Sequence, residues 1–164
     1  MLSAELPANE AERQQALDRQ NLVDTPADPY LDTLTRLARE LFGVKMVLVS
    51  LVDKDRQWFK SRQGLEVPET PRSISFCGHA VALGDALVVE DSLADPRFCD
   101  NPLVLQTPKV RFYAGQPRRD ASGMILGTLC LLDTTPRWLS EAELARLRDL
   151  AYLVEGYLRL LEQS

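Results

Sequence analysis

The sequence predicts an α+β fold with one central, mainly antiparallel sheet of five to six strands. Three observations carry this prediction. The segments follow the order helix, two strands, short helix, strand, irregular lobe, two strands, helix. Hairpin connections outnumber crossovers along that order, and only parallel strands require crossovers. Two strands are apolar on both faces, so we expect the terminal helices on one face of the sheet and segment 62–108, with a ligand pocket, on the other.

Length and composition describe an ordinary globular chain. The 164 residues are 45% hydrophobic and 26% charged, which excludes the collagen-like, low-complexity and disordered classes. The formal net charge is −5 and the chain has no basic block, so neither nucleic acid nor an anionic membrane is an expected partner. No stretch approaches the roughly 18 apolar residues that cross a bilayer.

The N-terminus and the cysteines indicate a compartment. The first residues are polar and acidic, unlike those of a signal peptide. Three cysteines, Cys77, Cys99 and Cys130, form an odd and widely spaced set. This set predicts free thiols in a reducing compartment, and the sequence therefore predicts a cytoplasmic protein.

The chain divides into an N-terminal extension and one domain. Residues 1–27 are expected to form a tail and a short, mostly exposed helix over 9–24, ahead of a domain that spans 28–164. Asp28 is a good N-cap because proline follows it at the first helical position. Gly43 ends the helix that Asp28 begins.

The next segments predict the first hairpin and the lobe over the sheet. The run 44–53 is nearly continuously apolar, which predicts a strand buried on both faces. Residues 57–61 return as the second strand, and 62–75 form a loop. Further along come a short helix over 76–83, which Ser75 can cap, and a short strand over 86–90. A long connection over 91–108 is either functional or contains short helices.

Two more strands complete the predicted sheet. They span 110–114 and 125–133, and a polar hairpin over 116–123 is expected to join them. Arg118 and Arg119 form the tightest basic group of the chain and are assigned to the turn of this hairpin.

The last helix, about 140–162, predicts a dimer. It begins with a capping box of Ser140 and Glu143. One apolar stripe suits packing on the sheet, and a second stripe lies roughly 100° around the helix. We expect the second stripe to bind a second copy of the chain, with residues 9–24 alongside; the alternative is one wide core-facing stripe. The predicted interface residues are Leu150, Leu153, Tyr157 and Leu160.

A series of motifs resembles those of GAF domains, in the same order, over about residues 28–162. The motifs are Leu48–Asp53 with Arg56–Ser61, Ser75–Ala80, Asp95–Phe98 with Asn101–Pro102, Arg111–Gly115, and Gly127–Cys130 with Asp133. An ordered series is more specific than one short motif. The chain is similar to the bacterial GAF subtype found ahead of diguanylate cyclase or histidine kinase output domains.

This resemblance implies a PAS-like fold, a small-molecule pocket on one face of the sheet, and a homodimer formed through terminal helices. It does not identify the ligand, because the family is chemically diverse. The adjacent Cys-His pair of bilin-binding members is replaced here by Cys77-Gly78-His79. The candidate ligand-binding residues are Phe76, Cys77, His79, Asp91, Phe98, Arg111 and Tyr113.

Several of these residues also have a purely structural interpretation. Cys77 is either a thiol of lowered pKa at a helix start or a small buried hydrophobe, and we favour the latter. His79 is either a hydrogen-bonding group of the pocket or a core histidine. Arg111 on a central strand needs a partner, and we favour an internal pair with Asp91 or Asp95 over an anionic ligand.

We interpret the chain as a non-catalytic sensory domain that binds a small molecule and signals to an output domain in cis or in trans. No catalytic residue, metal site or cofactor is expected. One alternative is an enzyme similar to free methionine-(R)-sulfoxide reductase that uses Cys77 and Cys99. Against this alternative, that enzyme holds the substrate amine with acidic residues on its last core strand. The corresponding strand here carries no carboxylate before Asp133. Another alternative is a dimerisation module that binds no ligand.

Overall fold

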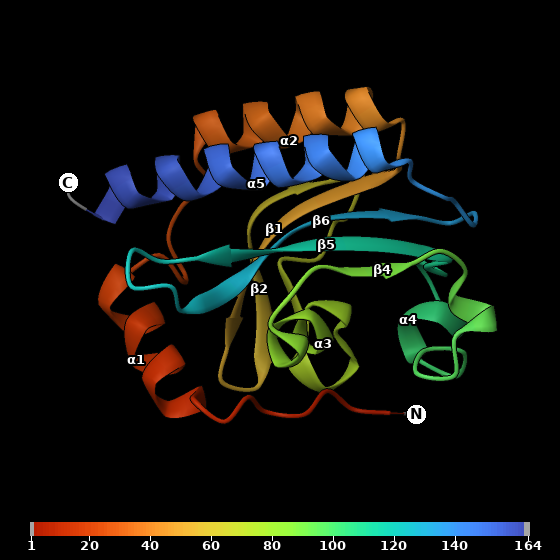
Figure 1. Ribbon diagram of the computed structural model, residues 1–164, viewed down its shortest axis with the longest axis horizontal. Coiled ribbons are helices and arrows are strands. Elements are labelled where there is room, and N and C mark those ends of the chain that lie inside the picture. Colours follow the sequence, from red (N-terminus) through yellow and green to blue (C-terminus); the bar gives the residue numbers. More distant parts are fainter. Residues whose placement is uncertain (1, 163–164) are drawn as a thin grey trace.

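The computed structural model describes residues 2–162 and contains one six-stranded sheet between two layers of helices (Figure 1). The last two residues of the predicted domain lie outside this range. The sheet has the order β3-β2-β1-β6-β5-β4, and all neighbouring strands are antiparallel. This arrangement confirms the predicted α+β fold. The strands are β1 (Met46–Asp53), β2 (Arg56–Gln63), β3 (Glu69–Pro71), β4 (Leu87–Val89), β5 (Phe112–Arg119) and β6 (Ile125–Asp133).

The helices are α1 (Glu10–Gln20), α2 (Pro29–Phe42), α3 (Phe76–Leu83), α4 (Pro102–Leu105) and α5 (Glu141–Glu162). Helices α2 and α5 lie side by side on one face of the sheet, and α3 and α4 lie on the other (Figure 1). The long connection after β4 does contain short helices, namely α4 and a 3-10 turn over Ser92–Ala94. Within residues 2–162, no helix is long and apolar enough to cross a membrane.

The predicted helix caps are present. The Asp28 carboxylate accepts hydrogen bonds from the backbone N–H groups of the first turn of α2, and Gly43 ends that helix with a left-handed φ of 63°. The Ser75 hydroxyl accepts from the backbone N–H of Gly78 at the start of α3. At the start of α5, Ser140 and Glu143 form the reciprocal capping box, with both N···O distances at 3.1 Å. Each cap satisfies backbone donors that have no partner inside the helix.

Strand β1 requires helices on both faces of the sheet. Every residue of the strand except Asp53 is buried. Val47 and Val49 pack into the cluster that contains the core side chains of α2 and α5. Leu48 and Val52 pack into the cluster beneath α3. Burying one such aliphatic side chain contributes roughly 1.5–3 kcal/mol, so both helical layers are needed to keep β1 out of water.

The prediction for the hairpin between the last two strands was wrong. Strand β5 continues to Arg119, and the turn follows at Asp120, whose carboxylate accepts from the backbone N–H groups of Ser122 and Met124. Arg118 lies inside the strand, fully buried, and donates to Gln20 Oε1 over 2.8 Å. A hydrogen-bond partner on α1, far away in sequence, therefore allows the Arg118 guanidinium to be buried within a strand, although its polarity alone suggested a turn.

Helix α1 is shorter and more buried than expected. It ends at Gln20 because Asn21 adopts a left-handed φ of 52°. Leu17 lies in the main core, so one face of the helix is covered. Helix α1 contacts β6 near one end of the sheet and does not lie along α5; α2 occupies that position (Figure 1).

A carboxylate held between two guanidinium groups fixes α1 to the domain. Glu10 Oε1 lies 2.8 Å from Arg13 Nη2 and 2.6 Å from Arg72 Nη1. Both arginine side chains are buried. Burial alone would raise the pKa of Glu10, but hydrogen bonds from Arg13 and Arg72 outweigh it and lower this pKa to about 2.

Replacing Glu10 with Gln should therefore remove an acid-sensitive part of the stability. A carboxyl pKa that is lower in the folded state than in the unfolded state stabilises the fold. This stabilisation is fully present above the unfolded pKa of 4.5 and is lost as the pH falls toward 2. Because the carboxylate is partly exposed, we expect Glu10→Gln to cost about 1 kcal/mol at pH 7. The difference from wild type should vanish near pH 2, as measured by urea unfolding. The control Glu12→Gln, on the exposed side of the same helix, should match wild type throughout.

Candidate functional site

Four of the predicted site residues come together as a ring cluster under α3. The rings of Phe76 and Phe98 stack at a centroid distance of 4.2 Å, and Tyr113 lies 5.2 Å from Phe76. His79 meets Phe98 edge-on at 4.8 Å. Phe76, Phe98 and Tyr113 are each at most 1% exposed. These rings contact one another, so they occupy space where the sequence predicted an open cavity.

His79 and Cys77 project from α3 in different directions. His79 is half-buried, and its Nε2 lies 3.1 Å from the backbone oxygen of Leu2 in the N-terminal segment. Burial lowers the pKa of His79. Cys77 is buried, as the favoured interpretation required. Its sulfur lies 3.7 Å from the sulfur of Cys130, whereas Cys99 is partly exposed in the loop before α4.

The predicted pairing of Arg111 with Asp91 or Asp95 was wrong. The Arg111 guanidinium donates to the backbone oxygen of Val104 over 2.8 Å. Asp95 pairs with Arg97 at 2.7 Å, and Asp91 instead caps the following 3-10 turn. Arg111 precedes the first residue of β5, so its side chain follows the loop toward α4 rather than the alternation of the strand.

An apolar cavity of about 410 Å³ lies on the same face of the sheet, between the strands, α4 and the loop over 64–71. Its volume falls within the usual range of small-molecule sites. Strands β1, β2 and β6 form the floor of the cavity. Its walls are formed by the segment over 64–71 and by α4 with the following loop, which contributes Thr107 and Pro108. Apolar lining residues include Met46, Leu48, Phe59, Leu65, Val67, Leu103, Val110 and Leu132.

Gln57 is the polar exception in the floor of this cavity. Its side chain is 4% exposed, and Nε2 donates to Thr70 Oγ1 over 2.7 Å. Its Oε1 atom has no hydrogen-bond partner among the described residues. A buried polar atom without a hydrogen-bond partner costs stability. A ligand group that donates a hydrogen bond to Oε1 would therefore gain binding free energy. The sequence analysis missed Gln57, although it shares a strand face with the apolar Phe59.

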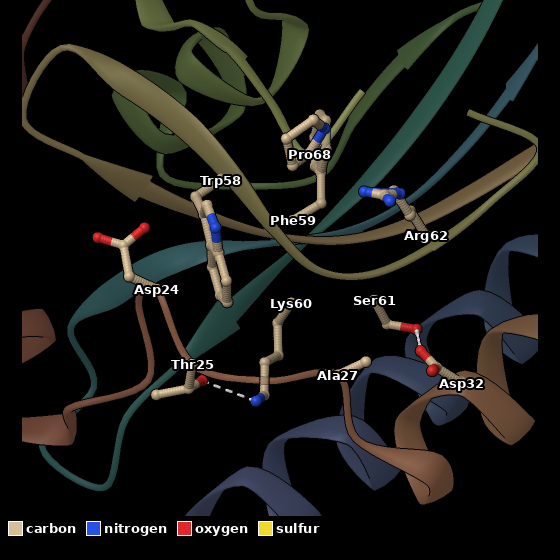
Figure 2. A pocket seen from close by; sticks show the side chains of 10 residues that line it. All are labelled: Asp24, Thr25, Ala27, Asp32, Trp58, Phe59, Lys60, Ser61, Arg62 and Pro68. Atoms are coloured by element: carbon tan, nitrogen blue, oxygen red, sulfur yellow. Dashed lines mark hydrogen bonds between the residues drawn. The ribbon is translucent and has the colours of Figure 1, made fainter. Parts of the chain in front are cut away.

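A second cavity, of about 500 Å³, lies at the outer edge of β2 and is polar (Figure 2). A β-bulge sets its geometry, because Phe59 and Ser61 both pair with β1 while Lys60 between them does not. Figure 2 shows Lys60 directed at Thr25, with a distance of 2.8 Å between Nζ and Oγ1. Burial lowers the pKa of Lys60.

Three charged groups of the polar cavity, Lys60, Asp32 and Asp24, have partners within the chain. Lys60 also donates to the backbone oxygen of Pro26, and the Ser61 hydroxyl donates to Asp32 over 2.7 Å (Figure 2). Asp24 pairs with Arg56. These contacts hold the linker between α1 and α2 against β2. The apolar cavity is therefore the better candidate for a ligand site.

Across residues 2–162, no three His, Cys, Asp or Glu side chains gather as a metal site requires.

The second stripe of α5 divides into covered and exposed residues. Leu150 and Tyr157 pack against the core, and the Tyr157 hydroxyl donates to Asp28 over 2.8 Å. Leu153 and Leu160 are 55% and 64% exposed. The other exposed large apolar side chains of these two helices are Tyr30, Leu37 and Leu41 of α2 and Tyr152 of α5.

The sheet order and the two helical layers define an α+β domain that encloses a cavity of small-molecule size. The family model of the GAF domain matches residues 26–158, and the chain belongs to the GAF family.

The chain is 37% identical over 165 residues to a cyclic di-GMP phosphodiesterase of Pseudomonas aeruginosa, and it spans 28% of that protein's length. Among solved structures, it resembles a free methionine-R-sulfoxide reductase of Neisseria meningitidis in complex with its substrate. That match has a TM-score of 0.67 and 22% identity, over 99% of this chain and 97% of that one. It also resembles the GAF domain of an Acinetobacter phosphoenolpyruvate-protein phosphotransferase, with a TM-score of 0.65 and 16% identity over 90% and 91%. These solved structures share the fold.

The ring cluster should behave as core. Truncating Phe98 to Ala removes a fully buried ring from a stack, so we expect a loss of about 3–5 kcal/mol in the free energy of unfolding. Phe98→Leu refills part of the volume and should cost less. Leu93→Ala, at a half-exposed site of the same lobe, serves as the control and should cost under about 0.5 kcal/mol. Urea unfolding measures all three, and a mild effect of Phe98→Ala would contradict this packing.

Proposed function

We propose that this chain is a non-catalytic sensory GAF domain that binds a small molecule and regulates an output domain. The observation that carries the proposal is the apolar cavity over β1, β2 and β6, with its single unpaired amide oxygen. The 37% identical relative is named for signalling chemistry, and this chain spans only 28% of it. Because most of that relative lies outside the matched part, we propose that an output domain acts together with this domain, in cis or in trans. Three unpaired thiols support a cytoplasmic location.

The lining restricts the chemistry of the ligand. No Lys or Arg is among the described lining residues, whereas Glu66 and Glu69 lie at the rim. An anionic ligand would therefore lose its hydration without gaining a cationic partner. The ligand best suited to the cavity is neutral and mostly apolar, with one N–H or O–H group that donates to Gln57 Oε1.

The ligand residues predicted from the sequence act in this proposal from beside the cavity. Phe76, Cys77, Phe98 and Tyr113 belong to the same side-chain cluster as Leu48, Phe59 and Leu132 of the floor. We assign to them, together with His79, the support of the floor. Asp91 and Arg111 fix the loops that border α4.

The exposed face of α2 and α5 is the proposed dimer interface, and its occupant is a second copy of the chain. Leu37 and Leu41 of α2 are also exposed, on the helix that lies beside α5 (Figure 1). A large exposed apolar patch typically marks an interface. Exposed charges of both signs lie on these helices, including Arg36 and Asp149, as a self-complementary two-fold interface requires.

Filling the cavity should weaken ligand binding. The probe is N-phenylnaphthylamine, a neutral apolar fluorophore with one N–H donor. Leu103→Trp places a large ring in the cavity and should weaken probe affinity at least about tenfold, which corresponds to about 1.4 kcal/mol. Val67→Trp, at the exposed rim, should act in the same direction. Leu105→Trp, on the same helix but outside the cavity, should bind as wild type does.

Removing the Gln57 amide separates the polar contact from cavity volume. Gln57→Leu should weaken the probe severalfold and lower the free energy of unfolding by at most about 1 kcal/mol, because it deletes a buried oxygen that has no partner together with one hydrogen bond to Thr70. Equal probe affinity in the cavity-filling variants and in wild type would favour a dimerisation module that binds no ligand. Turnover of free methionine-(R)-sulfoxide would overturn the non-catalytic assignment.

Charging the exposed face should separate the dimer into folded monomers. Wild type should sediment as a dimer at about tens of micromolar protein. The double variant Leu153→Glu, Leu160→Glu should sediment as a monomer with an unchanged circular dichroism spectrum, since both side chains point away from the core. Leu105→Glu carries the same change on another surface and should remain dimeric. A monomeric wild type would contradict this interface.

A further inference from the structure

The two buried cysteines form a close pair between a helix and the sheet. Cys77 lies in the first turn of α3, and Cys130 lies within β6. Their sulfur atoms are 3.7 Å apart, and both side chains are at most 2% exposed. A disulfide requires about 2.05 Å between sulfurs, so a small approach of α3 to the sheet would bring them to bonding distance.

Hydroxyl groups surround one sulfur of this pair. Thr128 Oγ1 donates to Cys77 Sγ over 3.0 Å, and the Tyr113 hydroxyl donates to it over 3.2 Å. Ser50 Oγ lies 3.0 Å from Thr128 Oγ1 and extends the chain of hydroxyls into β1. Hydrogen bonds to a sulfur acceptor favour the thiolate over the thiol. A cysteine that served only as a small apolar side chain would not need these donors.

The same contacts give the two thiols different pKa values. Burial alone would raise the pKa of Cys77, but hydrogen bonds from Cys130, Ser50, Thr128 and Tyr113 lower it to about 7. Burial and the neighbouring charge of Cys77 raise the pKa of Cys130. The contacts therefore favour a thiolate at Cys77 beside a thiol at Cys130, the combination from which a disulfide forms.

We propose that Cys77 and Cys130 are a redox pair that a hydroperoxide converts into an intramolecular disulfide. The Cys77 thiolate attacks the terminal oxygen of hydrogen peroxide, the O–O bond breaks, and hydroxide leaves while sulfur is oxidised to the sulfenic acid. The Cys130 sulfur then attacks Cys77, the S–O bond breaks, and the Cys130 proton leaves with the oxygen as water. One peroxide is reduced to two waters overall, and a dithiol reverses the step by exchange.

The disulfide would join α3 to β6 beneath the ring cluster. Tyr113 contacts both Cys77 and Phe76, so oxidation acts on the packing of the lobe that borders the apolar cavity. Both sulfurs are covered, so α3 must open transiently before peroxide enters. Oxidation of the pair should therefore be slower than oxidation of the partly exposed Cys99, and a low concentration of urea should accelerate it.

Peptide mapping tests the pair directly on the unmodified chain. The reduced protein is treated with hydrogen peroxide, blocked with N-ethylmaleimide and digested with trypsin. Cleavage after Arg72, Arg97, Lys109 and Arg119 leaves the three cysteines on separate peptides. We expect a cross-link between the peptides of Cys77 and Cys130 that dithiothreitol reverses. If both still react fully with maleimide after denaturation, at peroxide doses that oxidise Cys99 completely, the proposal is overturned.

Variants separate the chemistry from packing. Cys99→Ser should keep the cross-link, whereas Cys130→Ser should lose it and expose a Cys77 sulfenic acid that dimedone traps. Tyr113→Phe removes one donor and little volume, and a pKa of Cys77 raised by one unit would slow cross-linking about fivefold at neutral pH. An unchanged rate in Tyr113→Phe would contradict the role of the hydroxyls. A cross-link between Cys77 and Cys99 would overturn the pairing.

Discussion

Two-sided burial of the central strands is the constraint on which the rest of the molecule depends. β1 and β6 pair with one another in the middle of the sheet, and nearly all their side chains are buried on both faces. One face is covered by α2 and α5, and the other by α3, α4 and their loops (Figure 1). Removing either layer would return aliphatic surface to water, so neither layer is dispensable for folding.

The two layers are built differently, and this difference leaves room for a ligand. α2 and α5 are long and present continuous apolar stripes to the sheet. On the other face, α3 and α4 are short, and loops complete the cover. Phe76, Phe98 and Tyr113 fill the area under α3, while the area toward α4 keeps its cavity. Loops cannot follow a sheet as closely as a helical stripe does, so the irregular layer is where a pocket forms.

Features that depend on neighbouring residues were predictable from the sequence. The caps at Asp28, Ser75 and Ser140 each need a donor only a few positions away, and all three are present. The continuous apolar strands also predicted that both faces of the sheet are covered, one by helices and the other by segment 62–108. Each of these signals is contained within one segment, so no knowledge of the tertiary structure was needed.

Features that depend on distant partners were not predictable. Arg118 looked like a turn residue because its acceptor, Gln20, lies 98 positions away. The contact between Cys77 and Cys130 spans 53 positions and crosses from helix to sheet. Gln57 left a weak signal, because alternation with Phe59 on β2 placed it on an apolar face. Its missing hydrogen-bond partner became visible only once the surrounding loops were in position.

The carboxylate of Glu10 has a consequence for where this domain begins. The match to the GAF family starts at residue 26, after α1. Yet Glu10 accepts from the buried Arg72, Gln20 accepts from the buried Arg118, and Leu17 fills part of the main core. A chain trimmed to the matched region would lose all three at once and open the end of the sheet to water. The boundary drawn by family similarity and the boundary of the folding unit therefore fall at different residues, and the second lies upstream of Glu10.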